Sequence, residues 1–322
     1  MIVHEGGSAQ AKVLAGVARA VIRPALALYP ARGPLSAGRH AIELVAHVQP
    51  RSRKVRVRQV KHGHWDGELV RPRGTKRGTA AIVYFHGGGF LFCGTATHRK
   101  VVEQLSLRTG VPVLSVNYRQ HGRGTVRESV ADGLDAVLWM LAQGYDPQRL
   151  VLAGDSAGGH IAFAVAMALR DRGIALAGLV GLSPWLDFDN TVRIAAPYAV
   201  RESYLPAKRL DRIAQLVTGQ PIIEPSLSPV NGKLRGLPPT LLICSTDEIL
   251  RHDSEIAAKR LRAAGVPVAL HGWEGQVHAF PVLAGLVPES DEALGLACEF
   301  IREHVGVAEG GRHLRAVGDV AS

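Results

Sequence analysis

The chain has 322 residues, of which 47% are hydrophobic and 20% charged. This composition is ordinary for a globular protein, so the chain does not belong to a class of proteins with a strongly biased amino-acid composition. The length suits one large α/β core or two modest ones. The net charge of +10 is concentrated in residues 1–80, which hold 15 Lys/Arg against 4 Asp/Glu.

The basic N-terminal quarter allows two interpretations. In its densest part, residues 51–58, Val55 and Val57 alternate with Arg56 and Arg58, as a half-buried strand requires. Charge on the outward positions protects an edge strand from pairing with another sheet. The alternative is contact with an anionic membrane surface, a polyanion or an acidic partner. We favour the edge strand and keep membrane contact as an open alternative.

The first helical pattern runs from Lys12 to Leu28, and Pro24 predicts its division into two short amphipathic helices. Arg19, Arg23 and Pro24 interrupt the apolar run, so the segment lacks the hydrophobic region of a signal peptide and is too short to span a bilayer. The three cysteines have no metal-ligand spacing and cannot all pair within the chain, which indicates a reducing compartment. We therefore expect a cytoplasmic protein, with peripheral membrane association as the alternative.

Beyond residue 55 short apolar runs alternate with helical spacing. The expected strands are Ala80–Phe85, Val111–Asn117, Leu150–Ala153, Leu179–Leu182, Leu241–Ser245 and Val266–His271. The expected helices are Thr97–Arg108, Glu128–Ala142, Ala157–Arg172, Ser254–Ala264 and Glu292–His304. This alternation predicts an α/β fold with a mostly parallel sheet covered by helices on both faces, and chemistry at the C-terminal ends of the strands.

The proline-rich segment after Asp189 breaks the alternation and indicates an inserted lid. The predicted organisation has five parts: 1–50 as the N-terminal part of a helical cap, 51–188 as the first part of the core, 189–238 as the cap insertion, 239–307 as the second part of the core, and 308–322 as a flexible tail.

Ser156 is the candidate nucleophile. It stands in Gly154-Asp155-Ser156-Ala157-Gly158, between the expected strand Leu150–Ala153 and an Ala-rich helix. That strand–turn–helix context is typical of a nucleophile elbow, in which flanking glycines allow a strained serine to face the substrate. Asp155 is expected to form hydrogen bonds that hold the elbow.

A glycine-rich loop, His86-Gly87-Gly88-Gly89-Phe90, follows the strand Ala80–Phe85. Glycines let the backbone approach a substrate oxygen closely. We expect the N–H groups of Gly87, Gly88 and Ala157 to form an oxyanion hole, which binds the negative oxygen of a tetrahedral intermediate.

The acid and the base are expected later in the chain, in the order Ser, Asp, His. Asp247 follows the strand Leu241–Ser245 and is the predicted acid, with its neighbour Glu248 as the competing candidate. His278 lies in the loop after the strand Val266–His271 and is the predicted general base.

Taken together, these motifs make the chain resemble the hormone-sensitive-lipase group of α/β-hydrolases, the bacterial family IV carboxylesterases. The similar motifs are His86–Phe90, Asn117–Arg119, Gly154–Gly159, Ser183–Asp187, Asp247–Leu250 and His278. The resemblance covers residues 55–305 and implies an α/β-hydrolase sheet, a helical cap, and hydrolysis of short- to medium-chain acyl esters without a cofactor or metal. It also implies that Trp185 and the cap line the substrate pocket.

The candidate pocket residues are His86, Phe90, Asp155, Trp185, Leu186 and Phe280. The chain departs from the family in residues 120–128, where Gln120-His121-Gly122-Arg123-Gly124 begins a segment that replaces the usual Leu-Ala-Pro-Glu-rich stretch. That departure puts the packing beside the site and the substrate range in question.

The sequence therefore predicts a serine carboxylesterase that acts on a small-molecule ester through an acyl-enzyme intermediate, with no nucleic-acid partner. Amide or lactone hydrolysis by the same residues is an alternative, as is a non-catalytic homologue that binds a small molecule. A homodimer is a further open possibility.

Overall fold

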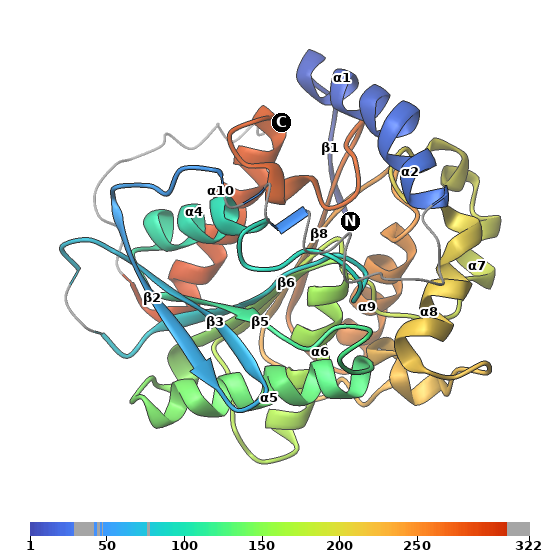
Figure 1. Ribbon diagram of the computed structural model, residues 1–322. Helices are drawn as coiled ribbons and strands as arrows, with labels where there is room; N and C mark the ends of the chain where they lie inside the picture. The colour runs from blue at the N-terminus through green and yellow to red at the C-terminus, as the bar shows by residue number, and fades with distance from the viewer. Residues whose placement is uncertain (29–41, 44–45, 47, 76–77, 308–322) are drawn as a thin grey trace, which may run out of the picture.

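The computed structural model describes residues 1–28, 42–43, 46, 48–75 and 78–307 and is built around one nine-stranded sheet (Figure 1). The strand order is β1-β9-β8-β7-β6-β4-β5-β3-β2. The strands are β1 (Ile2–His4), β2 (Val55–His62), β3 (Trp65–Pro72), β4 (Ala81–Phe85), β5 (Val113–Asn117), β6 (Leu150–Asp155), β7 (Gly178–Leu182), β8 (Thr240–Ser245) and β9 (Val268–Trp273).

The sheet is mostly parallel, as predicted. The seven strands from β1 to β5 in the sheet order run parallel, while β3 is antiparallel to β5 and β2 is antiparallel to β3. All six expected strands are present within a few residues of their expected bounds. Strand β1 was not expected from the sequence, because its three residues are too few to form a recognisable pattern.

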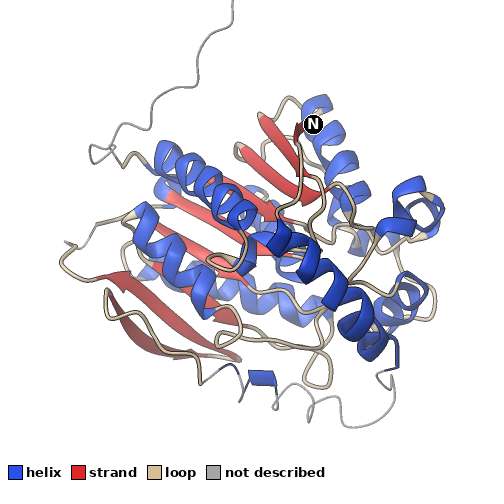
Figure 2. Ribbon diagram, turned by 90° about the horizontal axis from the view of Figure 1, so that it is seen from above, coloured by secondary structure: helices blue, strands red, loops and turns tan. Residues whose placement is uncertain are grey.

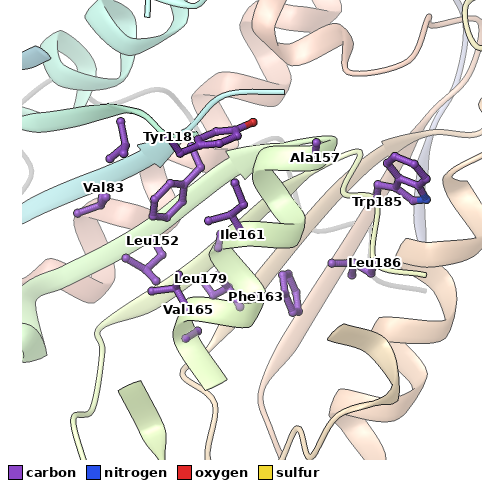
Figure 3. Close-up of a cluster of buried hydrophobic side chains, with 14 of the residues drawn as sticks. Val83, Tyr118, Leu152, Ala157, Ile161, Phe163, Val165, Leu179, Trp185 and Leu186 are labelled. Atoms are coloured by element: carbon purple, nitrogen blue, oxygen red, sulfur yellow. The ribbon is translucent and has the colours of Figure 1, made fainter. Parts of the chain in front are cut away.

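Helices cover both faces of the sheet, as the apolar strands require. One face packs against α4 (Arg99–Thr109) and α10 (Pro288–Val305), and the other against α5 (Val126–Ala142), α6 (Ala157–Arg170) and α9 (Arg251–Ala263). Figure 3 shows part of the second interface, where Val83 and Leu152 of the sheet lie near Ile161 and Val165 of α6. These helices fix the strand ends that carry the candidate site.

The N-terminal helical segment consists of α1 (Ala9–Val17), a π-helical turn η1 (Ala18–Ile22) and α2 (Arg23–Leu28). Pro24 does not separate two helices here, because it lies in the first turn of α2, where a missing N–H is tolerated. The predicted break is replaced by the π-helical turn.

The insertion after β7 is built of short helices that lie beside α1 and α2 (Figures 1 and 2). Arg19 Nη2 donates to the carbonyl of Arg201 at 3.2 Å, and Arg23 Nη1 to that of Glu202 at 2.8 Å. The two parts of the predicted cap are therefore in contact. Residues 29–41 of its first part and the predicted tail 308–322 lie outside the described residues. The helices of the insertion are α7 (Thr191–Ala195), η3 (Pro197–Arg201), η4 (Ala207–Arg209), α8 (Leu210–Thr218), η5 (Pro225–Leu227) and η6 (Pro229–Asn231), and two further short helices elsewhere are η2 (Pro147–Arg149) and η7 (Phe280–Leu283).

The basic segment at 51–58 enters β2, which is an edge strand as predicted. Val55 is buried and Arg56 is exposed, while the guanidinium of Arg58 lies 5.4 Å from the ring centroid of Trp139. Arg51 pairs with Glu68. Contact of this region with a membrane surface stays a prediction. In the described part of the chain, no helix combines the length and hydropathy needed to cross a membrane.

Candidate active site

Ser156 occupies the sharp turn between β6 and α6, with φ of 50° and ψ of −119°. A positive φ is strained for a serine and places its side chain above the C-terminal edge of the sheet. The flanking glycines are required: a Cβ on Gly158 would lie 1.9 Å from the carbonyl oxygen of Phe85, and one on Gly154 would lie 2.4 Å from that of Gly158. The backbone here has the sharp strand–turn–helix geometry that a nucleophile elbow requires, and the role of Ser156 stays a prediction.

His278 joins the serine to an acid. Its Nε2 lies 2.9 Å from Ser156 Oγ, and its Nδ1 lies 2.8 Å from Oε2 of Glu248. The three side chains come from the turns after β6, β8 and β9, which meet because the parallel strands end at the same edge. The arrangement gives the imidazole one nitrogen toward the nucleophile and one toward a carboxylate, as general-base catalysis requires.

The prediction that Asp247 orients His278 is wrong. The carboxylate of Asp247 faces the other side of the turn, where Oδ1 lies 2.7 Å from Arg201 Nε and Oδ2 accepts the Gly275 N–H at 3.0 Å. Its side chain is 24% exposed, whereas that of Glu248 is fully buried. Neighbouring residues after a strand project to opposite sides, and the competing candidate Glu248 is the one that points inward.

The environment of His278 favours its charged form. Burial lowers the pKa of the imidazole, but the charge and hydrogen bond of Glu248, with smaller contributions from Glu202 and Asp155, outweigh burial and raise the pKa above its ordinary value. A raised pKa makes His278 a stronger proton acceptor from Ser156, provided that the pH is high enough to keep the imidazole neutral.

The candidate oxyanion hole also needs a correction, because the N–H of Gly87 is already used. It donates to Oδ1 of Asp155 at 2.9 Å. Gly88 and Gly89, with φ of 110° and 62°, border the same cavity as Ser156. Within the described ranges, the N–H groups of Gly88, Gly89 and Ala157 donate no hydrogen bond to another residue. Gly89 therefore replaces Gly87 as a candidate donor.

Asp155 holds the glycine-rich loop against the elbow. Its carboxylate accepts hydrogen bonds from the Tyr84 hydroxyl at 2.8 Å and the Gly87 N–H, and it lies 3.2 Å from Nε2 of His98. Burial raises the pKa of Asp155, but His98 and Tyr84 more than offset burial and lower it below the ordinary value. The carboxylate is thus an anion that fixes two loops, as expected from its position in the motif.

A mostly apolar cavity of about 440 Å³ lies over Ser156 and His278. Of the six candidate pocket residues, Asp155 and Trp185 border it. The other four are buried beneath the cavity wall and were predicted wrongly: His86 stacks on Tyr118, Phe90 packs on His160 and Trp185, Leu186 lies in the core, and Phe280 packs on Trp273.

Much of the cavity wall comes from the cap, whose individual lining residues were not among the predicted pocket residues. Apolar cap residues that border the cavity include Leu14, Ala18, Ile22 and Leu26 from the N-terminal helices and Leu205, Leu210, Ile213 and Leu216 from the insertion. The four residues of the N-terminal helices recur every four positions, and Leu210, Ile213 and Leu216 of the insertion recur every three. This spacing was the available signal, and Leu205 lies outside it. The surface of the cavity is therefore shared between two segments far apart in the chain.

The segment at 120–128, which departs from the family pattern, packs behind the glycine-rich loop. Gln120 is buried and its Nε2 donates to the carbonyl of Cys93 at 3.0 Å, with His86 Nε2 at 3.3 Å. Thr125 and Glu128 form a reciprocal cap at the start of α5. The altered segment therefore still braces the site, with an amide in place of a proline-rich stretch.

Comparisons with known proteins agree with the fold. Residues 82–282 match the family model described as alpha/beta hydrolase fold. The esterase LipU of Mycobacterium tuberculosis is 39% identical over 242 residues, covering 72% of this chain and 80% of LipU. The carboxylesterase/phospholipase LipF of the same organism is 32% identical over 315 residues, covering 94% of this chain and 84% of LipF. The crystal structure of an esterase from the bacterial hormone-sensitive lipase family has a TM-score of 0.84 and 30% identity, covering 94% of this chain and 100% of that one.

Proposed function

The chain belongs to the alpha/beta-hydrolase family and is a carboxylesterase of the hormone-sensitive-lipase type, and from this premise we propose that Ser156, His278 and Glu248 form its catalytic triad. The observation that carries the proposal is the continuous contact from Ser156 Oγ through the imidazole to Glu248 Oε2, at 2.9 and 2.8 Å. A non-catalytic binding protein has no physical need for this buried arrangement.

The first half of the reaction forms an acyl-enzyme. His278 Nε2 takes the proton of Ser156 Oγ as that oxygen attacks the ester carbonyl carbon. Glu248 accepts the Nδ1 hydrogen bond and stabilises the imidazolium that results. The N–H groups of Gly88, Gly89 and Ala157 bind the carbonyl oxygen as it becomes negative. When the tetrahedral intermediate collapses, His278 returns the proton to the alkoxide and the alcohol leaves.

Water completes the cycle. His278 takes a proton from a water molecule as its oxygen attacks the acyl carbon. When the second tetrahedral intermediate collapses, the bond to Ser156 Oγ breaks, His278 returns the proton to that oxygen, and the carboxylic acid is released. The elbow and the glycine-rich loop do not have to move, since the same oxygen position is used in both halves.

The substrates that fit best are esters of short to medium acyl chains. The cavity volume of about 440 Å³ lies in the range of roughly 300–1,000 Å³ typical of small-molecule sites. Leu, Ile and Val together are the commonest residues of its mostly apolar walls, so an alkyl chain is better matched to them than a charged group.

A panel of p-nitrophenyl esters of increasing acyl length, run with wild type and Ser156→Ala, tests the proposal. We expect hydrolysis of short and medium esters by wild type only, and stoichiometric labelling of wild type by an organophosphonate. Undiminished hydrolysis by a folded Ser156→Ala protein would overturn the assignment of the nucleophile. Amide and lactone analogues in the same panel separate ester hydrolysis from the two related activities.

A further inference from the structure

Glu202 is a buried carboxylate of the cap that lies against the catalytic turn. It follows η3, and only 1% of its surface is exposed. Oε1 accepts the N–H groups of Tyr204 at 2.6 Å and Leu205 at 2.9 Å, and Oε2 accepts the N–H of Ile249 at 2.8 Å. Burying a carboxylate is costly unless hydrogen bonds replace its lost hydration, and these three N–H donors offset that cost for Glu202.

The partners of Glu202 belong to two different parts of the molecule. Tyr204 and Leu205 are in the cap, whereas Ile249 directly follows Glu248 in the turn after β8. On the outer side of the same turn, the preceding cap residue Arg201 pairs with Asp247. Two successive cap residues, Arg201 and Glu202, thus bind the turn through the residues on either side of Glu248.

The N-terminal helices are tied to this contact as well. Arg19 and Arg23 donate to the carbonyl oxygens of Arg201 and Glu202. A continuous path of hydrogen bonds therefore runs from the N-terminal helices, through Glu202, to the backbone beside the catalytic acid. Displacement of the cap would remove an acceptor from the turn that orients His278.

The charge of Glu202 also acts on His278. The groups that face the imidazole are Glu248 from the turn after β8, Asp155 from the elbow, and Glu202 and the ring of Tyr204 from the cap, with the Tyr204 centroid 6.0 Å away. Burial raises the pKa of Glu202 above its ordinary value, and His278 and the three N–H donors offset that shift only in part. All three hydrogen-bond partners are donors, so the ionised carboxylate is the form that suits the site.

We propose that Glu202 is a positioning residue of the active site, which holds the turn carrying Glu248 against the cap and adds a negative charge beside the imidazolium formed by His278. This role rests on the proposed triad. It makes the catalytic geometry depend on the seated cap, because the acceptor for the Ile249 N–H comes from the insertion and not from the hydrolase core.

The test compares Glu202→Gln with wild type by kcat, KM and the pH profile of kcat/KM on p-nitrophenyl butyrate. Gln has the same size but no charge, and its amide cannot accept all three N–H bonds. We expect kcat to fall about 10-fold or more with little change in KM, since the acid turn is less well held. We also expect the acid limb of the profile to move to lower pH, because less negative charge faces the imidazole.

A matched control is Glu224→Gln, which removes an exposed carboxylate of the same insertion, paired with Arg127. It should leave kcat and the acid limb unchanged. If Glu202→Gln lowers only the melting temperature while kcat and the profile stay at wild-type values, Glu202 is merely structural and the proposal is wrong.

A second variant covers the case in which Glu202→Gln does not fold. Glu202→Asp keeps the charge but shortens the reach to Ile249, so kcat should fall with the acid limb unmoved. A folded Glu202→Asp protein with wild-type kcat contradicts the proposal. Organophosphonate titration of wild type distinguishes failure of the proposed triad from failure of the role of Glu202. If wild type is not labelled, the proposed triad is wrong. If wild type is labelled but the Glu202 variants keep the wild-type kcat and pH profile, only the role of Glu202 is wrong.

Discussion

Glu248 Oε2 lies 2.8 Å from His278 Nδ1, although the adjacent Asp247 carries an equally suitable carboxylate on the other side of the turn. Removing the charge of Glu248 leaves the imidazole without its anionic partner, while removing that of Asp247 breaks a part-exposed ion pair. We expect Glu248→Gln to lower kcat by about 10³–10⁴-fold. Asp247→Asn should change kcat only a few-fold, since part-exposed pairs contribute roughly 0–1 kcal/mol. Steady-state kinetics of the two variants check this, and equal losses would contradict the assignment of the acid.

The pH profile follows from the raised pKa of His278. The base must be neutral, so kcat/KM should fall about tenfold per pH unit below an acid limb that lies above the ordinary imidazole value of about 6.5. A raised folded-state pKa also means that the stabilisation by protonated His278 is full below about 6.5 and is lost as the pH rises through the folded value. Wild-type kcat/KM across this range is the measurement; an acid limb below about 6 is incompatible with the buried carboxylate environment.

A fully buried ion pair connects the cap to the core. Arg193 Nη1 in α7 lies 2.8 Å from Oδ1 of Asp253 in α9, and both side chains are 0% exposed. Oδ2 of Asp253 also accepts the N–H groups of Leu186 and Asp187. We expect Asp253→Asn to destabilise the protein by about 3–5 kcal/mol, because it leaves a buried guanidinium without its counter-charge. Urea denaturation measures the loss. The exposed Asp171→Asn is the control, and equal midpoints for the two variants would refute the prediction.

The elbow does not tolerate a side chain at Gly158, where a Cβ would meet the Phe85 carbonyl oxygen. Gly158→Ala should cost about 3 kcal/mol or more and abolish organophosphonate labelling, since the backbone must shift to relieve the clash. Gly16 in α1 has open space around it and provides the contrast. Gly16→Ala should raise stability by about 0.5–1 kcal/mol. Thermal unfolding and labelling of both variants test this; normal labelling of Gly158→Ala would argue against the elbow.

The acyl-length range should respond to the inner face of the N-terminal helices. Ile22 borders the cavity, whereas the preceding Val21 is 61% exposed. Ile22→Trp should raise KM for p-nitrophenyl octanoate about 10-fold while leaving the acetate ester nearly unaffected, because the larger ring occupies space needed by a long chain. Val21→Trp is the control from the same turn and should leave both esters unchanged. An identical chain-length profile for Ile22→Trp would exclude this wall from the acyl site.

The sequence alone was enough for the features that depend on local backbone geometry or on chain order. The glycines beside Ser156 predict an elbow because a sharp strand-to-helix turn needs residues without a Cβ next to the nucleophile. The alternation of apolar runs and helical spacing predicts the parallel sheet and, with it, the convergence of loops that brings His278 to Ser156. Residues 51–58 predict an edge strand from their alternation of Val and Arg.

Only the tertiary structure decided which of several neighbouring groups faces the site. Asp247 and Glu248 are equivalent in the sequence, and the direction of each side chain follows from how the turn packs against the cap. Gly87 differs from Gly88 and Gly89 because Asp155, 68 positions away, accepts its N–H. The same holds for Glu202, because its neighbours in the sequence do not distinguish it from the other acidic residues of the insertion. Its role arises because the folded cap brings its carboxylate to the Ile249 N–H, 47 residues further along the chain.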